Sequence, residues 1–123
     1  MGWDVGMKLA DRIGIGVDIE DISRFRKLPF NRNKRFYTRI FHEDEIKYSL
    51  AKADPYQHFT ARYCAKEAFI KAVSWRIDDY REIQVRLVGK KPFIYWKGKR
   101  HLLSLAHEGD KAIAFVVVVD DGC

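Results

Sequence analysis

The chain has 123 residues, the length of a single domain, and 47% of them are hydrophobic and 14% aromatic. This composition excludes a disordered chain, and 23 Lys and Arg against 17 Asp and Glu give a net charge of +6, which favours an anionic partner without identifying it. A monomer of this size buries only about two-thirds of the surface of its unfolded chain, so self-association is one way to enlarge the core.

The N-terminal segment "MGWDVGMKLADR" has charges where a signal peptide needs an apolar core, and no apolar run reaches transmembrane length. We expect a single domain over residues 1–123, with residues 1–11 as an irregular extension. Cys64 and Cys123 form no disulfide framework, which favours a reduced setting. The sequence therefore predicts a soluble, cytoplasmic protein that does not enter a membrane.

The segment "RIGIGVDIE" (12–20) predicts the first strand, because apolar residues alternate with small or acidic ones. Asp18 is unusual there, since a carboxylate is a poor strand former and is costly to bury without a partner. Three interpretations of Asp18 are open: it is a structural acid, it lies at the end of the strand, or its carboxylate holds a cation. Glu20 shares its face of the strand, so a metal ion could use either carboxylate. Gly14 and Gly16 would let another backbone or a ligand approach closely.

Basic residues dominate the next stretch, which has no acid between Asp21 and Glu43. Pro29 interrupts it, so we expect a short helix, a loop and a second helical turn. The phenylalanines of this stretch are better interpreted as core than as surface. The basic residues are Arg24, Arg26, Lys27, Arg32, Lys34, Arg35 and Arg39.

Two helices are predicted next, over residues 42–53 and about 55–74. The first begins acidic and ends basic, as suits the helix dipole, and "DP" at 54–55 gives the second an N-cap and a proline at its first position. Glu67 and Lys71 share one face of this helix, and taken alone such a pair is usually a solvated ion pair. Four alanines form a separate stripe roughly 60° wide, which suits close packing: Ala61, Ala65, Ala68 and Ala72.

The C-terminal half is β-rich. Strands are predicted at 82–88, 92–96, 101–107 and 112–119, joined by turns at "GKK", "KGKR" and "EGDK". A strand, then helices, then antiparallel strands indicate an α+β domain.

Four blocks in this order resemble the holo-acyl-carrier-protein synthase family, the small type of 4′-phosphopantetheinyl transferase. They are "GIGVDIEDISRF" (14–25), "RFYTRIFHEDEI" (35–46), "FTARYCAKEAFIKA" (59–72) and "LSLAHEGDKAIAFVVV" (103–118). The third block is similar to the signature F-x-x-R-[FY]-x-x-KEA-x-x-KA. The resemblance covers most of the chain and implies an antiparallel sheet packed against a long central helix.

The resemblance implies an enzyme that transfers 4′-phosphopantetheine from coenzyme A to a serine of acyl carrier protein for fatty acid synthesis, with Mg²⁺ required and 3′,5′-ADP released. By position, Asp18 and Glu67 would be the metal-binding carboxylates. Two carboxylates are enough to bind Mg²⁺, because the ion keeps several water ligands and also binds substrate phosphates. Lys71 would hold a coenzyme A phosphate, with Arg62 and Lys66 as weaker candidates. The general base is Glu67 or a metal-bound water.

His107 would act in catalysis and in binding the pyrophosphate, from a neighbouring subunit, since the family's sites lie at the interfaces of a homotrimer. The alternative is a strand-end histidine that is hydrogen-bonded within its hairpin. The acidic carrier protein would dock on Arg24, Arg35 and Arg39, which match basic positions of the family; they could equally be a solvated surface.

Two features depart from the family's pattern. Ala106 stands where the closing block usually has a second serine, so a hydroxyl near the phosphates is missing. After Ala72 the chain reads "VSWRIDD" in place of a glycine-rich turn. The competing interpretations are a basic nucleic-acid-binding module, which leaves Asp18 and Glu67 unexplained, and another metal-dependent phosphotransfer enzyme on the same scaffold. On the favoured interpretation neither nucleic acid nor a membrane is a partner.

Overall fold

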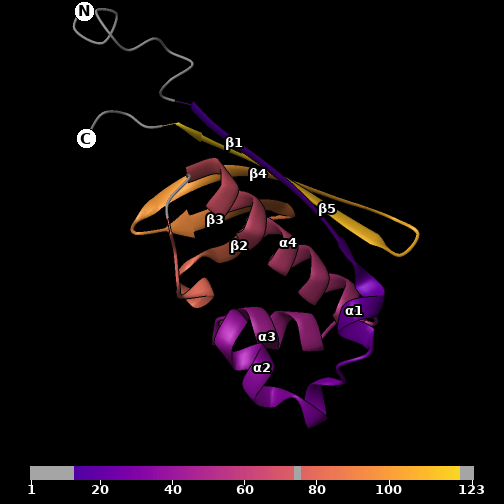
Figure 1. The fold of residues 1–123 in the computed structure, drawn as a ribbon. Helices are drawn as coiled ribbons and strands as arrows, with labels where there is room; N and C mark the ends of the chain where they lie inside the picture. Colours follow the sequence, from indigo (N-terminus) through magenta and orange to yellow (C-terminus); the bar gives the residue numbers. More distant parts are fainter. Residues whose placement is uncertain (1–12, 74–75, 120–123) are drawn as a thin grey trace, which may run out of the picture.

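The computed structural model describes residues 13–73 and 76–119 (Figure 1). The predicted N-terminal extension over residues 1–11 and Cys123 lie outside the described residues. The helices are α1 (Ile22–Arg26), the 3₁₀ turn η3 (Phe30–Arg32), α2 (Lys34–Ile40), α3 (Glu43–Leu50), α4 (Pro55–Val73) and the 3₁₀ turn η4 (Tyr80–Glu82). The strands are β1 (Ile13–Asp21), β2 (Gln84–Val88), β3 (Lys91–Trp96), β4 (Lys99–Glu108) and β5 (Lys111–Val119).

The strands form one antiparallel sheet in the order β1-β5-β4-β3-β2. The first strand of the sequence therefore pairs with the last, and Asp18 stands opposite Ala114. Helix α4 packs across one face of this sheet, mainly on β1 and β5, while α1, α2 and α3 gather beyond its N-terminal half (Figure 1). The predicted α+β fold, with an antiparallel sheet against a long central helix, is confirmed.

Small residues let α4 lie close to β1. A Cβ added to Gly14 or Gly16 would overlap the main-chain carbonyl oxygen of Ala72 or Ala68, respectively. The sequence left open whether these glycines admit a backbone or a ligand, and the structure shows that they admit the backbone of α4. Asp18 and Glu20 lie on the same face of β1 as Gly16, so this contact holds both side chains beside α4.

The interior divides into two clusters. One lies between α4 and the sheet and includes Phe69, Ile94, Trp96 and Val116. The other is aromatic and joins α1, α2 and α4, with Phe25, Tyr37, Phe41 and Phe59 buried and Phe30 and Phe36 partly buried against them. The expectation that these phenylalanines belong to the core is confirmed. No described helix is both long enough and apolar enough to cross a membrane.

The sheet face opposite α4 remains apolar and exposed. Its residues come from neighbouring strands in register, such as Val17 opposite Phe115. Ile15 is 61% exposed and Leu102 is 60% exposed. The exposed large hydrophobic residues of this face are Ile15, Val17 and Ile19 of β1, Leu102 of β4, and Phe115 and Val119 of β5. We call this set the outer apolar face.

The predicted boundaries differ slightly from the observed ones. The strands β3, β4 and β5 begin one or two residues earlier than predicted, while β2 begins two residues later because a 3₁₀ turn occupies Tyr80–Glu82. The three predicted hairpin turns each contain a glycine with positive φ, at Gly89, Gly98 and Gly109. Glycine suits these positions because it has no Cβ to clash in the left-handed region.

Candidate functional site

Asp18 lies in the middle of β1 and points to the side that faces α4. Its side chain is 10% exposed, and Oδ1 accepts a hydrogen bond from Lys71 Nζ at 3.0 Å. Oδ2 is buried and has no hydrogen-bond partner among the described residues. Of the alternatives for this acid, the strand-end position is therefore wrong, and the carboxylate does hold a cation, the Lys71 ammonium. Its second oxygen therefore keeps an acceptor position that no described residue uses.

Glu20 stands two residues along on the same face. Arg24 Nη1 lies 3.3 Å from its Oε1. The pKa of Glu20 is raised to about 7, first by burial and then by the hydrogen bond and negative charge of Asp18, with a smaller contribution from the charge of Glu67 and a lowering effect from Arg24. Three carboxyl groups thus repel one another electrostatically at this place. A cation bound among them would be favoured for the same reason.

Glu67 faces this group from α4. Its Oε2 accepts a hydrogen bond from Tyr80 Oη at 2.5 Å, and its Oε1 accepts one from Tyr63 Oη at 3.4 Å. The two tyrosine rings are stacked, with centroids 6.0 Å apart and planes 11° apart. Burial, followed by the hydrogen bond and charge of Glu67, raises the pKa of Tyr80, so its hydroxyl stays protonated and donates.

Lys66 is fully buried and does not face this site. Its Nζ donates to Glu45 Oε1 at 2.7 Å, to the Tyr80 carbonyl at 2.9 Å and to the Ile83 carbonyl at 2.5 Å. All three protons of the ammonium therefore have internal acceptors. This burial contradicts the prediction that Lys66 helps to bind coenzyme A. Its position is structural, joining α4 to α3 and to the chain that enters β2.

Arg62 and His107 line one pocket of about 400 Å³ on the other side of α4 from Asp18. The guanidinium of Arg62 is largely buried and lies 4.1 Å from the ring centroid of Tyr48, and its Nε has no hydrogen-bond partner among the described residues. Burial lowers the pKa of Arg62. The pocket is otherwise lined by Gln57, His58, Ala61, Val85, Leu87, Lys90, Pro92, Leu105 and Ala106. Its charged lining is positive, which suits a phosphorylated ligand.

The predicted docking arginines lie on two helices. Arg24 on α1 is exposed, pairs with Glu20 and lies 5.4 Å from the ring centroid of Tyr63. Arg35 and Arg39 on α2 are exposed. Arg24 is thus linked to the acidic group through Glu20, whereas Arg35 and Arg39 are exposed positions of α2.

The acidic group suits a hard divalent cation such as Mg²⁺. Within the part of the chain that the structure describes, Asp18 Oδ2 has no hydrogen-bond donor, and Glu67 lies near enough for its charge to act on Glu20. Nowhere in residues 13–73 and 76–119 do three or more His, Cys, Asp or Glu side chains form a ready-made metal cage. Mg²⁺ keeps several waters and typically takes one or two carboxylates together with substrate phosphates, so Asp18 and Glu67 are the residues that would hold it.

The structure therefore divides the predicted site residues into two sets on one subunit. Asp18, Glu67 and Lys71 meet between β1 and α4, whereas Arg62 and His107 meet at the separate pocket. Sequence reasoning missed three side chains that belong to these places: Tyr63, Tyr80 and His58. Tyr63 stands four residues before Glu67 on the helix, a spacing that could have indicated the contact. Tyr80 gave no such signal, because its approach depends on how the chain returns after α4.

Comparison with known proteins identifies the family. Residues 14–116 match the family model described as the 4′-phosphopantetheinyl transferase superfamily. The chain is 36% identical over 109 residues to the holo-[acyl-carrier-protein] synthase of Thermodesulfovibrio yellowstonii, covering 85% of this chain and 96% of that protein.

Two solved structures have the same fold. The synthase of Neisseria meningitidis has a TM-score of 0.75 and 29% identity, with 85% of this chain and 96% of that one covered. The synthase of Bacillus anthracis, solved in complex with CoA (3′,5′-ADP), has a TM-score of 0.75 and 29% identity, with coverage of 88% and 96%. The chain therefore belongs to the 4′-phosphopantetheinyl transferase superfamily, among the enzymes of the holo-[acyl-carrier-protein] synthase family.

Proposed function

We propose that this enzyme transfers 4′-phosphopantetheine from coenzyme A to a serine of acyl carrier protein, with Mg²⁺ as cofactor, and so supplies holo-carrier for fatty acid synthesis. The observation on which this rests is the buried Asp18: its Oδ2 has no hydrogen-bond partner among the described residues, while Lys71, which also lies near Glu67, donates to its Oδ1. Two carboxylates and an ammonium at one place suit a pyrophosphate together with its metal ion.

The reaction needs alignment and charge neutralisation more than it needs a nucleophile from this chain. The serine oxygen of the carrier forms a bond to the β-phosphorus of coenzyme A, the bond from that phosphorus to the bridging oxygen breaks, and 3′,5′-ADP leaves. Asp18 and Glu67 would hold Mg²⁺, which would neutralise the developing charge on the phosphate oxygens. Lys71 is positioned to pair with a phosphate oxygen, and the serine proton passes to Glu67 or to water.

The pocket of Arg62 and His107 is the proposed site for the nucleotide part of coenzyme A. Its size of about 400 Å³ and positive lining fit a phosphorylated ligand, and the similar Bacillus anthracis enzyme was solved with CoA (3′,5′-ADP). Ala106 also lines this pocket, so the hydroxyl expected at that position is absent from a wall that would face the ligand.

A homotrimer with interfacial sites would reconcile the two separated sets of residues. One subunit would contribute Asp18, Glu67 and Lys71, and its neighbour would contribute the pocket of Arg62 and His107. The outer apolar face supports association, and a groove of about 430 Å³ lined by Phe93, Leu102, Phe115 and Val117 continues it across β3, β4 and β5. Apolar surface of this extent usually marks an interface.

The carrier protein would dock on the exposed arginines of α1 and α2. Acyl carrier proteins are acidic, so Arg24, Arg35 and Arg39 present the complementary charge. Arg24 would lie nearest the reaction because it contacts Glu20. We also propose a cytoplasmic location, which suits the free thiol of the buried Cys64.

The test is to incubate the chain with coenzyme A, Mg²⁺ and an apo-acyl carrier protein and to weigh the carrier by mass spectrometry. We expect the carrier to gain one phosphopantetheine, and chelation of the metal to prevent it. Asp18→Asn and Glu67→Gln should each lower the rate by at least about 100-fold, since metal-assisted charge stabilisation is worth several kcal/mol. Asp78→Asn, at an exposed position outside the acidic group, serves as a control.

An unchanged carrier mass would contradict the proposal. Wild-type rates in Asp18→Asn or Glu67→Gln across a Mg²⁺ titration would remove the metal assignment while leaving the transfer reaction intact. Steeply salt-dependent binding of oligonucleotides without transfer would instead favour the nucleic-acid-binding alternative.

A further inference from the structure

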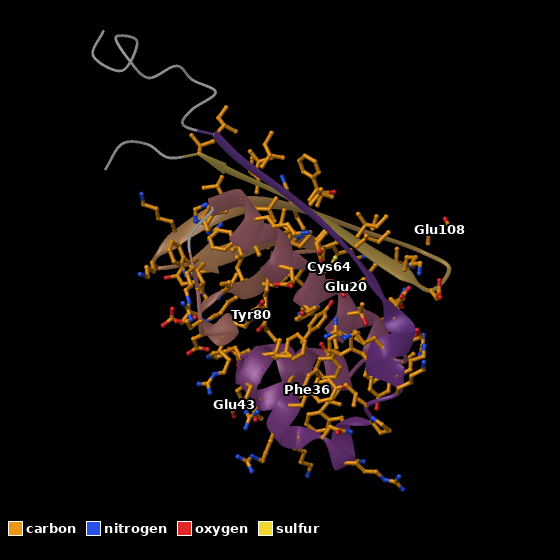
Figure 2. The ribbon with its side chains drawn as sticks, in the orientation of Figure 1. Glu20, Phe36, Glu43, Cys64, Tyr80 and Glu108 are labelled. Atoms are coloured by element: carbon orange, nitrogen blue, oxygen red, sulfur yellow. The ribbon has the colours of Figure 1, made fainter. Side chains whose placement is uncertain are left out.

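Tyr80 contacts the acidic group from a segment outside the four sequence blocks that resemble the family. It lies in η4, between α4 and β2, and Figure 2 shows it beside α4. Its hydroxyl donates to Glu67 Oε2 at 2.5 Å, the shorter of the two hydrogen bonds that Glu67 accepts from tyrosines. The ring of Tyr63, stacked on that of Tyr80, brings the second donor to Oε1. Both carboxylate oxygens of Glu67 are therefore held.

The backbone of Tyr80 is fixed by a different side chain of the same helix. Lys66 Nζ donates to the Tyr80 carbonyl at 2.9 Å, and Glu45 of α3 fixes that ammonium at 2.7 Å. Two consecutive residues of α4 thus hold both ends of Tyr80: Lys66 binds its carbonyl, and Glu67 accepts from its hydroxyl. Because Lys66 is fully buried, this arrangement cannot be relaxed by a surface side chain moving aside.

We propose that Tyr80 is a positioning residue of the metal site, which sets the rotation of the Glu67 carboxylate so that its remaining lone pairs face Asp18. This inference rests on the proposed function, because it takes Glu67 as a metal ligand. A carboxylate oxygen has two acceptor positions, so one donor fixes its orientation and leaves the other position for a metal ion. Hydrogen bonds to a ligating side chain typically change metal affinity or activity by 10- to 100-fold.

A purely structural role for Tyr80 makes a different prediction. If its hydroxyl only anchored η4, its loss would lower stability and leave metal affinity unchanged. The raised pKa of Tyr80 agrees with a protonated donor directed at Glu67 but does not distinguish the two roles. A direct measurement of metal binding does so.

The experiment compares Tyr80→Phe and Tyr63→Phe with the wild-type chain. Mn²⁺ serves as the probe, and the electron paramagnetic resonance signal of the free aqueous ion reports binding without turnover. We expect Tyr80→Phe to weaken Mn²⁺ binding by about 10-fold or more, and Tyr63→Phe to have a smaller effect because its hydrogen bond is 3.4 Å long. Transfer by Tyr80→Phe should return towards the wild-type rate at high Mg²⁺. Tyr95→Phe is the matched control, because that ring lies beneath the guanidinium of Arg86 at 3.9 Å.

Wild-type Mn²⁺ affinity in Tyr80→Phe would overturn the inference, as would an activity loss that high Mg²⁺ does not restore. Failure of the wild-type chain to bind Mn²⁺ would overturn it too. Failure of the proposed function appears separately, as a wild-type chain that binds Mn²⁺ but leaves the carrier mass unchanged. In that case the affinities of the variants still decide whether Tyr80 positions Glu67.

Discussion

Gly16 of β1 lies directly against the main-chain carbonyl of Ala68 in α4, so close that a methyl group on Gly16 would overlap its oxygen. Because Asp18 is two residues beyond Gly16 and Glu67 is adjacent to Ala68, this backbone contact sets the distance between the two proposed metal ligands. The separation of strand and helix is therefore part of the site geometry.

Gly16→Ala is expected to destabilise the protein by about 3 kcal/mol, because the methyl group meets a backbone atom that cannot rotate away. Urea denaturation followed by circular dichroism measures this. Gly109→Asn is the control, because that turn position has positive φ and open space around it, and Asn tolerates the left-handed region. Equal stability of Gly16→Ala and the wild-type chain would show that α4 can move away from β1.

Lys66→Met is expected to cost about 3–5 kcal/mol of stability. The substitution leaves the buried carboxylate of Glu45 and two carbonyls without their shared ammonium, and breaking one side of a buried ion pair is costly. Lys47→Met, at an exposed position of α3, should change stability by less than about 0.5 kcal/mol. If Lys66→Met were as stable as that control, the buried pair would not be what joins α3 to α4.

Arg35→Glu with Arg39→Glu should weaken docking of the carrier protein. Reversing two exposed charges opposite an acidic partner is expected to raise the KM for the carrier by about 10-fold at low salt, with kcat unchanged. The difference should shrink at 0.5 M salt, roughly where screening shortens to a few ångströms. Lys97→Glu with Lys99→Glu, at the turn between β3 and β4, is the control, because it changes the net charge by the same amount. An unchanged KM for the carrier would place docking elsewhere.

Val17→Glu should dissociate the proposed trimer. The new carboxylate would stand opposite Phe115 in the middle of the outer apolar face, where an interface would have to bury it unpaired. Sedimentation velocity should show a lower mass for this variant than for Lys47→Glu, whose substitution lies on α3. A monomeric wild-type chain with full transfer activity would contradict the interfacial site.

The pH dependence of stability should include a contribution from His58. Burial, followed by the charges of Arg62, Lys52 and His107, lowers its pKa below the ordinary 6.5 against the raising effect of Asp54. As the pH falls below about 6.5, the unfolded chain takes up this proton before the folded chain does, so the free energy of unfolding falls. His58→Gln should flatten that decline in denaturation curves at pH 7.5 and 5.5. Parallel curves for wild type and variant would refute the contribution.

Local sequence pattern predicted the elements and part of the site. The N-cap and proline at 54–55 located the start of α4, and the cost of burying an unpaired acid within an apolar strand indicated that Asp18 needs a partner, which Lys71 supplies. The small residues at 14 and 16 predicted a close approach, which the helix backbone makes. Each of these inferences depends on neighbours in sequence or on one strand, where spacing fixes geometry.

The errors and omissions have a common physical origin. Lys66 and Glu67 are adjacent, and the helical period places their side chains about 100° apart around the helix axis. The period alone does not determine which of the two side chains faces the solvent. Only the packing of α3 and η4 against α4 buries Lys66 and brings Tyr80 to Glu67. Likewise, His107 lies apart from Asp18 because β5 separates β4 from β1 in the sheet, and the helical period turns Arg62 about 140° away from Glu67.

The outer apolar face also has a consequence for how much working enzyme a given amount of chain provides. If the reaction requires residues from two neighbouring subunits, the concentration of complete sites rises more steeply than the concentration of polypeptide. At low expression, most chains would then be unassembled and would lack a complete active site. A modest increase in chain concentration would raise the rate of transfer more than proportionally. The sheet would thereby make output respond to protein abundance as a threshold.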